Sequence, residues 1–353
     1  MIDRVACSRQ DADYGQSMPM AAGNRDGTGP ARVLLFIKPF AHWAINRHAW
    51  ATAHPARHGT TAHAGNGVAT MNRTVLITGA GTGFGREIAL RLAARQWTVI
   101  AGVEIPSQIF QLEHEAEQRG VVVQVEKLDV TDAADRARFS MLDVDVLLNN
   151  AGIGEGGSMV DIPEAHLRRQ FEVNVIGPVM LTQAIARRMA TRRAGKIVFM
   201  SSCAGLTADP FTGAYSASKH AIEAIAEALG KELQEFGVAV ATVNPGPFLT
   251  GFNDRIFDAW KSWDKSRSDN LFDYEHIAYP YRQFDIKPVV DTTIGVIEGT
   301  IDTYRNVEPG QNVEMQRRQM DDAWTRRYDE NLGKRFALVE TYYDMQPGTP
   351  VDE

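Results

Sequence analysis

The chain has 353 residues, with 37 Lys and Arg against 44 Asp and Glu, and a formal net charge of -7. This unbiased composition fits a globular enzyme of one or two domains. The acidic balance argues against a general nucleic-acid binder, because such proteins need a basic footprint. Cys7 and Cys203 stand far apart and predict neither a disulfide framework nor a zinc site. They favour reduced thiols in a cytoplasmic protein.

Residues 1–70 differ from the rest and contain no acidic residue between Gly27 and Thr70. Without a sustained helical or strand period, they are predicted to form a flexible extension. A transit peptide, or a native start at Met71, is the alternative. The longest apolar run, 33–37, is too short to span a bilayer, and no membrane association is predicted. No carboxylate or cysteine accompanies the five histidines of the extension, so no metal site is expected; they are His42, His48, His54, His58 and His63.

After Met71, strands and helices alternate. Apolar runs predict strands at 74–78, 98–103, 121–128, 144–148, 196–200 and 238–243. Amphipathic stretches predict helices at 83–95, 107–119, 163–190 and 214–236, with a helix of only two turns between 129 and 144. Strands that are apolar on both faces indicate an α/β fold with a Rossmann-like, doubly wound parallel sheet and helices on both faces. Residues 71–353 are expected to form one domain.

A glycine-rich turn joins the first strand to the first helix. Gly79, Gly83 and Gly85 are spaced as TGxxxGxG within Thr78–Gly85, unlike the common GxGxxG fingerprint. Small residues let the backbone approach a pyrophosphate, which the helix N-terminus then binds. The alternative is a tight turn that needs glycine only for its backbone angles. The order strand, loop, helix favours a dinucleotide cofactor.

Glu104 ends the second strand, and no Arg or Lys stands beside it. An acidic side chain there would bind the adenosine ribose hydroxyls and repel a 2′-phosphate, so NAD is favoured over NADP. The alternative is that Glu104 is merely solvated.

Tyr215 and Lys219 stand one helical turn apart, and Ser202 follows an apolar strand. Residues four apart share a helix face, and a neighbouring ammonium favours the phenolate of a tyrosine. Tyr215 is therefore a candidate acid/base, and Lys219 is expected to lower its pKa. Ser202 would hold the substrate oxygen, because open parallel sheets bind ligands at the carboxyl ends of their strands. Each residue alone has a plainer explanation, as a surface or turn residue.

Together these motifs resemble the short-chain dehydrogenase/reductase family of the classical type, over about residues 73–250. Beside the glycine loop, Asn149-Asn150-Ala151-Gly152 resembles the family's NNAG motif. The resemblance implies catalytic roles for Asn174, Ser202, Tyr215 and Lys219, with Asn174 holding a water in a proton relay and Ser201 a less favoured serine. It implies cofactor contacts at Gly79, Thr82, Gly83, Phe84, Gly85, Glu104, Asp129, Val130, Asn150, Ala151, Gly152, Tyr215, Lys219, Pro245, Gly246 and Thr250.

The resemblance also implies a homodimer or homotetramer and a substrate lid at about 247–285. Ten aromatic residues there would suit a bulky apolar alcohol or ketone, or would simply pack the lid onto the body; they are Phe248, Phe252, Phe257, Trp260, Trp263, Phe272, Tyr274, Tyr279, Tyr281 and Phe284. The family's usual closing strand with a VDGG-like sequence is not recognisable after Thr250, which puts the last strand in doubt.

The expected function is NAD(P)-dependent interconversion of a secondary alcohol and a ketone. A catalytically silent NAD(P)-sensing regulatory protein on the same fold is the alternative, but it would not need Tyr215 and Lys219. An epimerase or dehydratase would use a different glycine spacing.

Overall fold

A computed structural model describes residues 73–264 and 266–345. The predicted flexible extension and its histidines lie outside the described residues. So does the predicted start at Met71.

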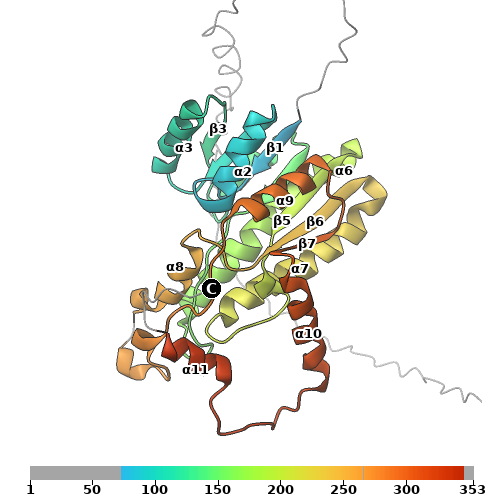
Figure 1. Ribbon diagram of the computed structural model, residues 1–353. Coiled ribbons are helices and arrows are strands. Elements are labelled where there is room, and N and C mark those ends of the chain that lie inside the picture. Colours follow the sequence, from blue (N-terminus) through green and yellow to red (C-terminus); the bar gives the residue numbers. More distant parts are fainter. Residues whose placement is uncertain (1–72, 265, 346–353) are drawn as a thin grey trace, which may run out of the picture. The chain divides into compact units, whose positions relative to one another are not determined.

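One sheet of seven strands organises the described residues (Figure 1). Every neighbouring pair is parallel, which confirms the predicted fold. The strand order is β3(Gln124–Lys127), β2(Thr98–Val103), β1(Thr74–Ile77), β4(Val146–Asn149), β5(Gly195–Met200), β6(Val238–Pro245), β7(Arg305–Glu308). The predicted strands are all present, with ends that differ by up to three residues.

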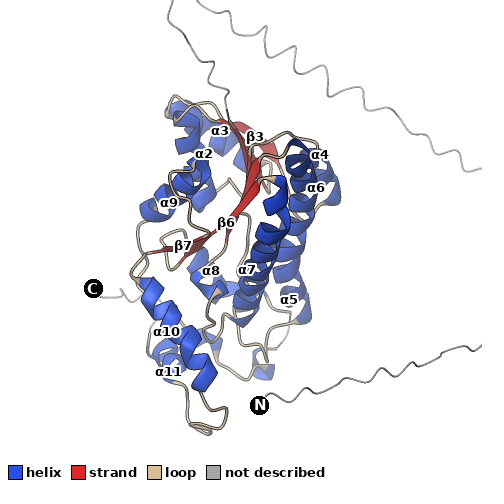
Figure 2. Cartoon of the chain, turned by 90° about the vertical axis from the view of Figure 1, so that its right-hand side faces the viewer, coloured by secondary structure: helices blue, strands red, loops and turns tan. Residues whose placement is uncertain are grey.

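Helices cover both faces of this sheet (Figure 2). Val75 and Ile77 of β1 belong to the core on one face, and Leu76 belongs to the core on the other. Alternating side chains of a strand point to opposite faces, so a strand buried on both sides is apolar throughout. The first face is covered by α2(Gly83–Ala94), α3(Ser107–Gln118) and α9(Lys287–Glu298), and the second by α4(Ala133–Ser140), α6(Gly177–Arg192) and α7(Gly213–Leu233).

The strand order changes direction at β1. β2 pairs with one side of β1, and β4 pairs with the other side. Connections from these strands leave to opposite faces and open a crevice at the carboxyl end of the sheet. The glycine loop follows β1, and the Asn150 segment follows β4, so both lie at this crevice.

The structure contains a closing strand, β7, although the sequence analysis put the last strand in doubt. β7 pairs with β6, with Arg305 opposite Thr242. Its sequence, RNVE, is mostly polar. Asn306 is the one buried residue of the four. The Asn306 side chain donates to the backbone oxygen of Thr242 at 3.0 Å. An edge strand of this composition carries no apolar run from which it could be predicted.

The single helix predicted over 163–190 is interrupted. It consists of α5(Glu164–Phe171), a π-helical segment Glu172–Ile176, and α6. Such π-segments insert an extra residue into a helix and often occur at functional sites. Here the segment contains Asn174.

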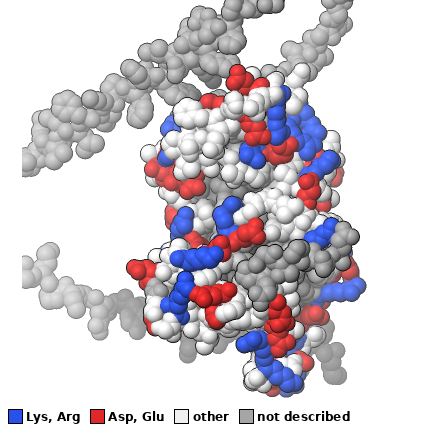
Figure 3. All heavy atoms as spheres, turned by 60° about the vertical axis from the view of Figure 1, so that its left-hand side comes forward, with Lys and Arg blue, Asp and Glu red and all other residues white. Residues whose placement is uncertain are grey.

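Three helices that follow β6 lie at the carboxyl end of the sheet: α8(Phe252–Asp258), α10(Asn312–Thr325) and α11(Ala337–Asp344). A mainly aromatic cluster of Phe211, Trp263, Tyr274, Ile277 and Tyr342 packs α11 against the residues after α8. No helix among the described residues is long and apolar enough to cross a membrane. Acidic and basic side chains are interspersed over the face shown in Figure 3.

Candidate active site

The glycine loop needs glycine for two physical reasons. Gly79 has φ +64° and Gly83 has φ +56°, a region that favours glycine. A side chain on Gly79 would also meet the Cα of Ala151 at 2.6 Å, so the loop after β1 touches the loop after β4. A side chain on Gly85 would meet Asn150 Nδ2 at 2.5 Å. Gly85 is therefore buried and does not line the cavity, and its predicted cofactor contact stays a prediction.

Asn150 and Ala151 are tied to β1 by hydrogen bonds. Thr78 Oγ1 accepts from the backbone N–H groups of Asn150 and Ala151, both at 3.0 Å. Asn150 Nδ2 donates to the backbone oxygens of Thr78 and Gly79. These bonds hold the segment after β4 against the end of β1 at the base of the crevice.

Asn174 also lies behind the cavity wall. Its Oδ1 accepts from Ile153 N at 2.8 Å, and its Nδ2 donates to Ile153 O at 2.9 Å and Ser218 Oγ at 3.1 Å. The side chain thus fastens the loop after β4 to α7. Asn174 is a positioning residue in this structure, and the proton relay stays a prediction.

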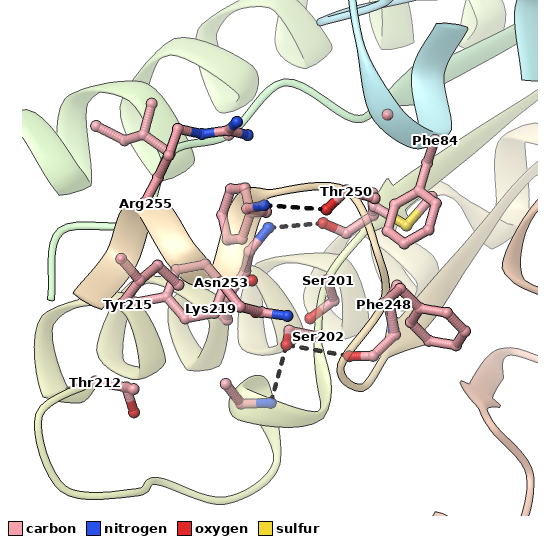
Figure 4. Close-up of a pocket in the computed structure, with 18 of the residues that line it drawn as sticks. Phe84, Ser201, Ser202, Thr212, Tyr215, Lys219, Phe248, Thr250, Asn253 and Arg255 are labelled. Carbon is pink, nitrogen blue, oxygen red and sulfur yellow. Dashed lines mark hydrogen bonds between the residues drawn. The ribbon is translucent and has the colours of Figure 1, made fainter. Parts of the chain in front are cut away.

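Tyr215, Lys219 and Ser202 come together in one cavity. Tyr215 and Lys219 lie on α7, and Ser202 follows β5 (Figure 4). The Ser202 hydroxyl donates to Pro245 O at 3.2 Å and accepts from Ala204 N at 3.1 Å. Ser202 also lies near enough to Tyr215 to lower the pKa of its phenol. Ser201 Oγ is buried without a hydrogen-bond partner among the described residues.

Burial controls the proton affinity of Tyr215. It raises the pKa of the phenol to about 12, and the nearby Ser202 side chain opposes that rise. Lys219 Nζ lies 5.7 Å from the centroid of the Tyr215 ring and donates to Met200 O at 2.8 Å. Burial lowers the pKa of Lys219 to about 8. The expected low pKa of Tyr215 is therefore not found in the protein alone, because desolvation of the phenol dominates and Lys219 is not among the causes of the shift.

The far end of the crevice is lined by Glu104, Asp129 and Val130, as expected for an adenosine site. Asp129 Oδ1 accepts from Thr131 N at 2.8 Å and from Thr131 Oγ1 at 2.7 Å. This turn fixes the Asp129 carboxylate at the cavity edge. Glu104 is exposed and no ion pair to it is found among the described residues.

Pro245, Gly246 and Thr250 close the cavity beside the glycine loop. Gly246 N donates to Glu308 O at 2.7 Å, so β7 supports this turn. A side chain on Gly83 would lie 3.6 Å from Thr250 Cγ2, which places Thr250 directly across the crevice. Apart from Gly85 and Asn174, every predicted site residue lines the same cavity of about 1180 Å³; its walls include Gly79, Thr82, Gly83, Phe84, Glu104, Asp129, Val130, Asn150, Ala151, Gly152, Ser202, Tyr215, Lys219, Pro245, Gly246 and Thr250.

The ten aromatic residues of the lid divide into two groups. Six line the cavity, namely Phe248, Phe252, Phe257, Tyr279, Tyr281 and Phe284. The other four pack in or against the aromatic cluster, namely Trp260, Trp263, Phe272 and Tyr274. The packing explanation therefore holds for these four residues, and the substrate explanation for the other six stays a prediction.

Several cavity residues were not predicted. Asp209 and Thr212 come from the loop between β5 and α7, Gln316 from α10, and Tyr342 from α11. Tyr342 is fully buried and stacks on Phe257, with ring centroids 5.3 Å apart. No local motif marks these residues, because only the fold brings them to the cavity.

Comparison with known proteins agrees with this geometry. An uncharacterized oxidoreductase of Bacillus subtilis, YusZ, is 37% identical over 188 residues, which cover 51% of this chain and 67% of that protein. Human retinol dehydrogenase 8 is 36% identical over 196 residues, covering 54% and 63%. The structure of an actinorhodin polyketide ketoreductase variant with NADPH superposes with a TM-score of 0.58 at 25% identity, covering 67% of this chain and 94% of that one.

The family model described as short chain dehydrogenase matches residues 73–260, from the start of β1 to the end of α8. That span contains the glycine loop, Ser202, Tyr215 and Lys219. The chain belongs to the short-chain dehydrogenase family and is an oxidoreductase built on that family's NAD(P)-binding fold.

Proposed function

We propose that this protein interconverts a secondary alcohol and a ketone with NAD(P), and that Tyr215 transfers the proton. The observation that carries the proposal is that Tyr215 and Ser202 line the same cavity as the glycine loop, with Ser202 near enough to the phenol to lower its pKa. A phenol and a hydroxyl side by side can both meet a single substrate oxygen.

The crevice suits a dinucleotide. The N-terminus of α2 has no side-chain cap and no acidic residue in its first turn, and Thr82, Gly83 and Phe84 face the cavity. Free N–H groups and the positive end of a helix dipole bind pyrophosphate at such a terminus. When bound, the nicotinamide supplies or accepts the hydride, and in its oxidised form it brings a positive charge that favours the Tyr215 phenolate.

The protein's own groups then handle the proton. In ketone reduction, Tyr215 donates its phenolic proton to the substrate oxygen as that oxygen gains negative charge. Ser202 donates a hydrogen bond to the same oxygen and stabilises the charge. A pKa of about 12 keeps Tyr215 protonated at neutral pH, which is the form that reduction needs. In oxidation the same proton moves in the opposite direction.

The aromatic lining supports a bulky apolar substrate. Phe252 packs on Tyr215 with ring centroids 5.5 Å apart, and Phe257 packs on Tyr279 at 5.4 Å. These rings extend the cavity away from the reacting oxygen. Burial of an apolar substrate against them would supply binding energy at about 25 cal/mol per Å².

The test is a panel of bulky secondary alcohols and ketones with NAD(H) and NADP(H), followed at the absorbance band of the reduced nicotinamide. Turnover of at least one ketone or alcohol is the expected result. Quenching of tryptophan fluorescence by NADH without any turnover across the panel would refute the proposal and favour a sensing protein.

We also propose a preference for NAD, because Glu104 is exposed at the adenosine end of the cavity. A carboxylate there repels a 2′-phosphate. Glu104→Ala is expected to reduce the ratio of kcat/KM for NAD over NADP by about tenfold, equivalent to ~1.4 kcal/mol. The ratio is measured with one alcohol for both cofactors. An unchanged ratio would show that Glu104 does not select the cofactor.

We also propose that the protein forms a homodimer or homotetramer and that it lies in the cytoplasm. Ile176 is 45% exposed and Met180 is 40% exposed, and both lie where the family resemblance places subunit contacts. Exposed apolar side chains at one place favour association. Light scattering on the purified chain is expected to give two or four times the monomer mass, and a monomeric mass would contradict this part.

A further inference from the structure

Asp209 lies on the wall of the aromatic-lined part of the cavity, here called the substrate chamber. Among the described residues, no cationic side chain pairs with its carboxylate. Asp209 is half-buried in the loop between β5 and α7 and lines the cavity. Its Oδ2 accepts from the Tyr281 hydroxyl at 3.1 Å. Among residues 73–264 and 266–345, no hydrogen bond reaches Oδ1, and no Lys, Arg or His pairs with the carboxylate.

The neighbours of Asp209 are neutral. Burial raises the pKa of Asp209, and the charged form of Asp209 in turn raises the pKa values of Tyr279, Tyr281 and Tyr342. These phenols form much of the chamber wall. A carboxylate taken out of water in such surroundings carries an uncompensated cost until a cation or further donors reach it.

Tyr342 closes the chamber wall beside Asp209. Its side chain is fully buried, at 0% relative exposure, so its hydroxyl does not open into the chamber. Tyr342 and Asp209 line the same cavity and interact electrostatically.

An ammonium group satisfies the carboxylate. It carries three N–H donors, and Asp209 Oδ1 accepts one of them. Its charge neutralises the carboxylate, and the surrounding aromatic rings add cation–π attraction. A neutral hydroxyl would give Asp209 one donor but would leave the buried negative charge uncompensated.

We propose that the chamber selects ketones and alcohols that carry a protonated amine, and that the amine binds Asp209 while the reacting oxygen meets Tyr215 and Ser202. The inference rests on the proposed alcohol and ketone chemistry and adds a substrate class to it.

The two ends of this chamber are connected by one aromatic wall. Tyr279 lies within electrostatic reach of both Asp209 and Tyr215. Its ring packs on Phe257 at 5.4 Å, and Phe257 stacks on Tyr342 at 5.3 Å. An apolar chain or ring lying along this wall would join the amine to the reacting carbon.

The test uses three ketones with one carbon skeleton, which differ only in a terminal aminomethyl, hydroxymethyl or ethyl group. For the wild-type protein, kcat/KM is expected to be at least about tenfold higher for the aminoketone than for the ethyl ketone, because hydrogen bonds to charged groups are the strong ones. The hydroxyketone should fall between them. Asp209→Asn is expected to bring the amine-to-ethyl ratio to about one.

Asp258→Asn is the matched control, because Asp258 is exposed on α8, pairs with Lys261 and does not line the cavity. It should keep the wild-type ratio. A wild-type ratio of one or less, or an unchanged ratio in Asp209→Asn, would overturn the inference. A hydroxyketone that equals or exceeds the aminoketone would overturn the assignment of a cation. Turnover of the ethyl ketone without a preference for the amine would refute only this inference. The absence of turnover with any ketone would refute both this inference and the proposed function.

Discussion

Replacement of Tyr215 by Phe is expected to lower kcat/KM by about 10²–10⁴-fold in both directions of the reaction, the range that one general acid/base contributes. The change removes a single hydroxyl, which is the only group of Tyr215 that can transfer a proton. The ring packing on Phe252, at 5.5 Å between centroids, is retained. Affinity for NADH should therefore stay close to that of the wild type, as measured by tryptophan fluorescence quenching.

Tyr328→Phe is a suitable control, since Tyr328 is 96% exposed and lies far along the chain from the motifs. It removes the same atom from a solvated position and should leave kcat/KM and NADH affinity unchanged. Wild-type turnover in Tyr215→Phe would refute the proposed proton transfer. If NADH binding were lost together with activity, the Tyr215 hydroxyl would bind the cofactor rather than transfer the proton.

The sequence was sufficient for the parts of the site that depend on local geometry. The glycine loop and the pair Tyr215 and Lys219 each lie within one turn or one helix, so spacing alone relates their residues. Ser202 and Asn150 follow buried strands, and parallel strands bring their carboxyl ends to one edge. The cavity therefore contained most of the predicted residues.

The chamber's far wall was not predictable in the same way. Tyr342 reaches the cavity because α11 packs on the aromatic cluster, a contact between segments far apart in the sequence. β7 is a polar edge strand whose pairing depends on β6 and on the buried Asn306. Neither feature has a short-range pattern, because non-local packing rather than local propensity determines it.

The electrostatic expectation for Tyr215 failed for a related reason. Spacing in the sequence shows that a lysine stands one turn from the phenol, but it does not show that both side chains are buried. In the structure, burial raises the pKa of Tyr215 and lowers that of Lys219. Desolvation is the largest cause of the pKa shift of each group. The same reasoning gives Lys219 a measurable effect on stability.

Lys219→Met is expected to reduce kcat/KM by at least about 10²-fold, because the ammonium lies 5.7 Å from the Tyr215 ring in the reacting cavity. Its effect on stability should depend on pH. Burial lowers the pKa of Lys219 from 10.5 to about 8, which corresponds to about 3 kcal/mol of unfavourable free energy in the folded state below pH 8. Between these two values the unfolded chain binds the proton more tightly, so the penalty shrinks as the pH rises.

Wild-type protein should accordingly gain stability relative to Lys219→Met as the pH is raised from 8 to 10. Methionine fills a similar volume without a charge, although the Met200 carbonyl loses its donor. Urea unfolding of both proteins at several pH values measures the difference directly, and comparison of the two cancels other titrating groups. Lys231→Met provides the control, since Lys231 is exposed and pairs only with Glu227. A constant difference between wild type and Lys219→Met across this range would show that the lysine is not desolvated, and the role of burial in setting the protonation of Tyr215 would then also fail.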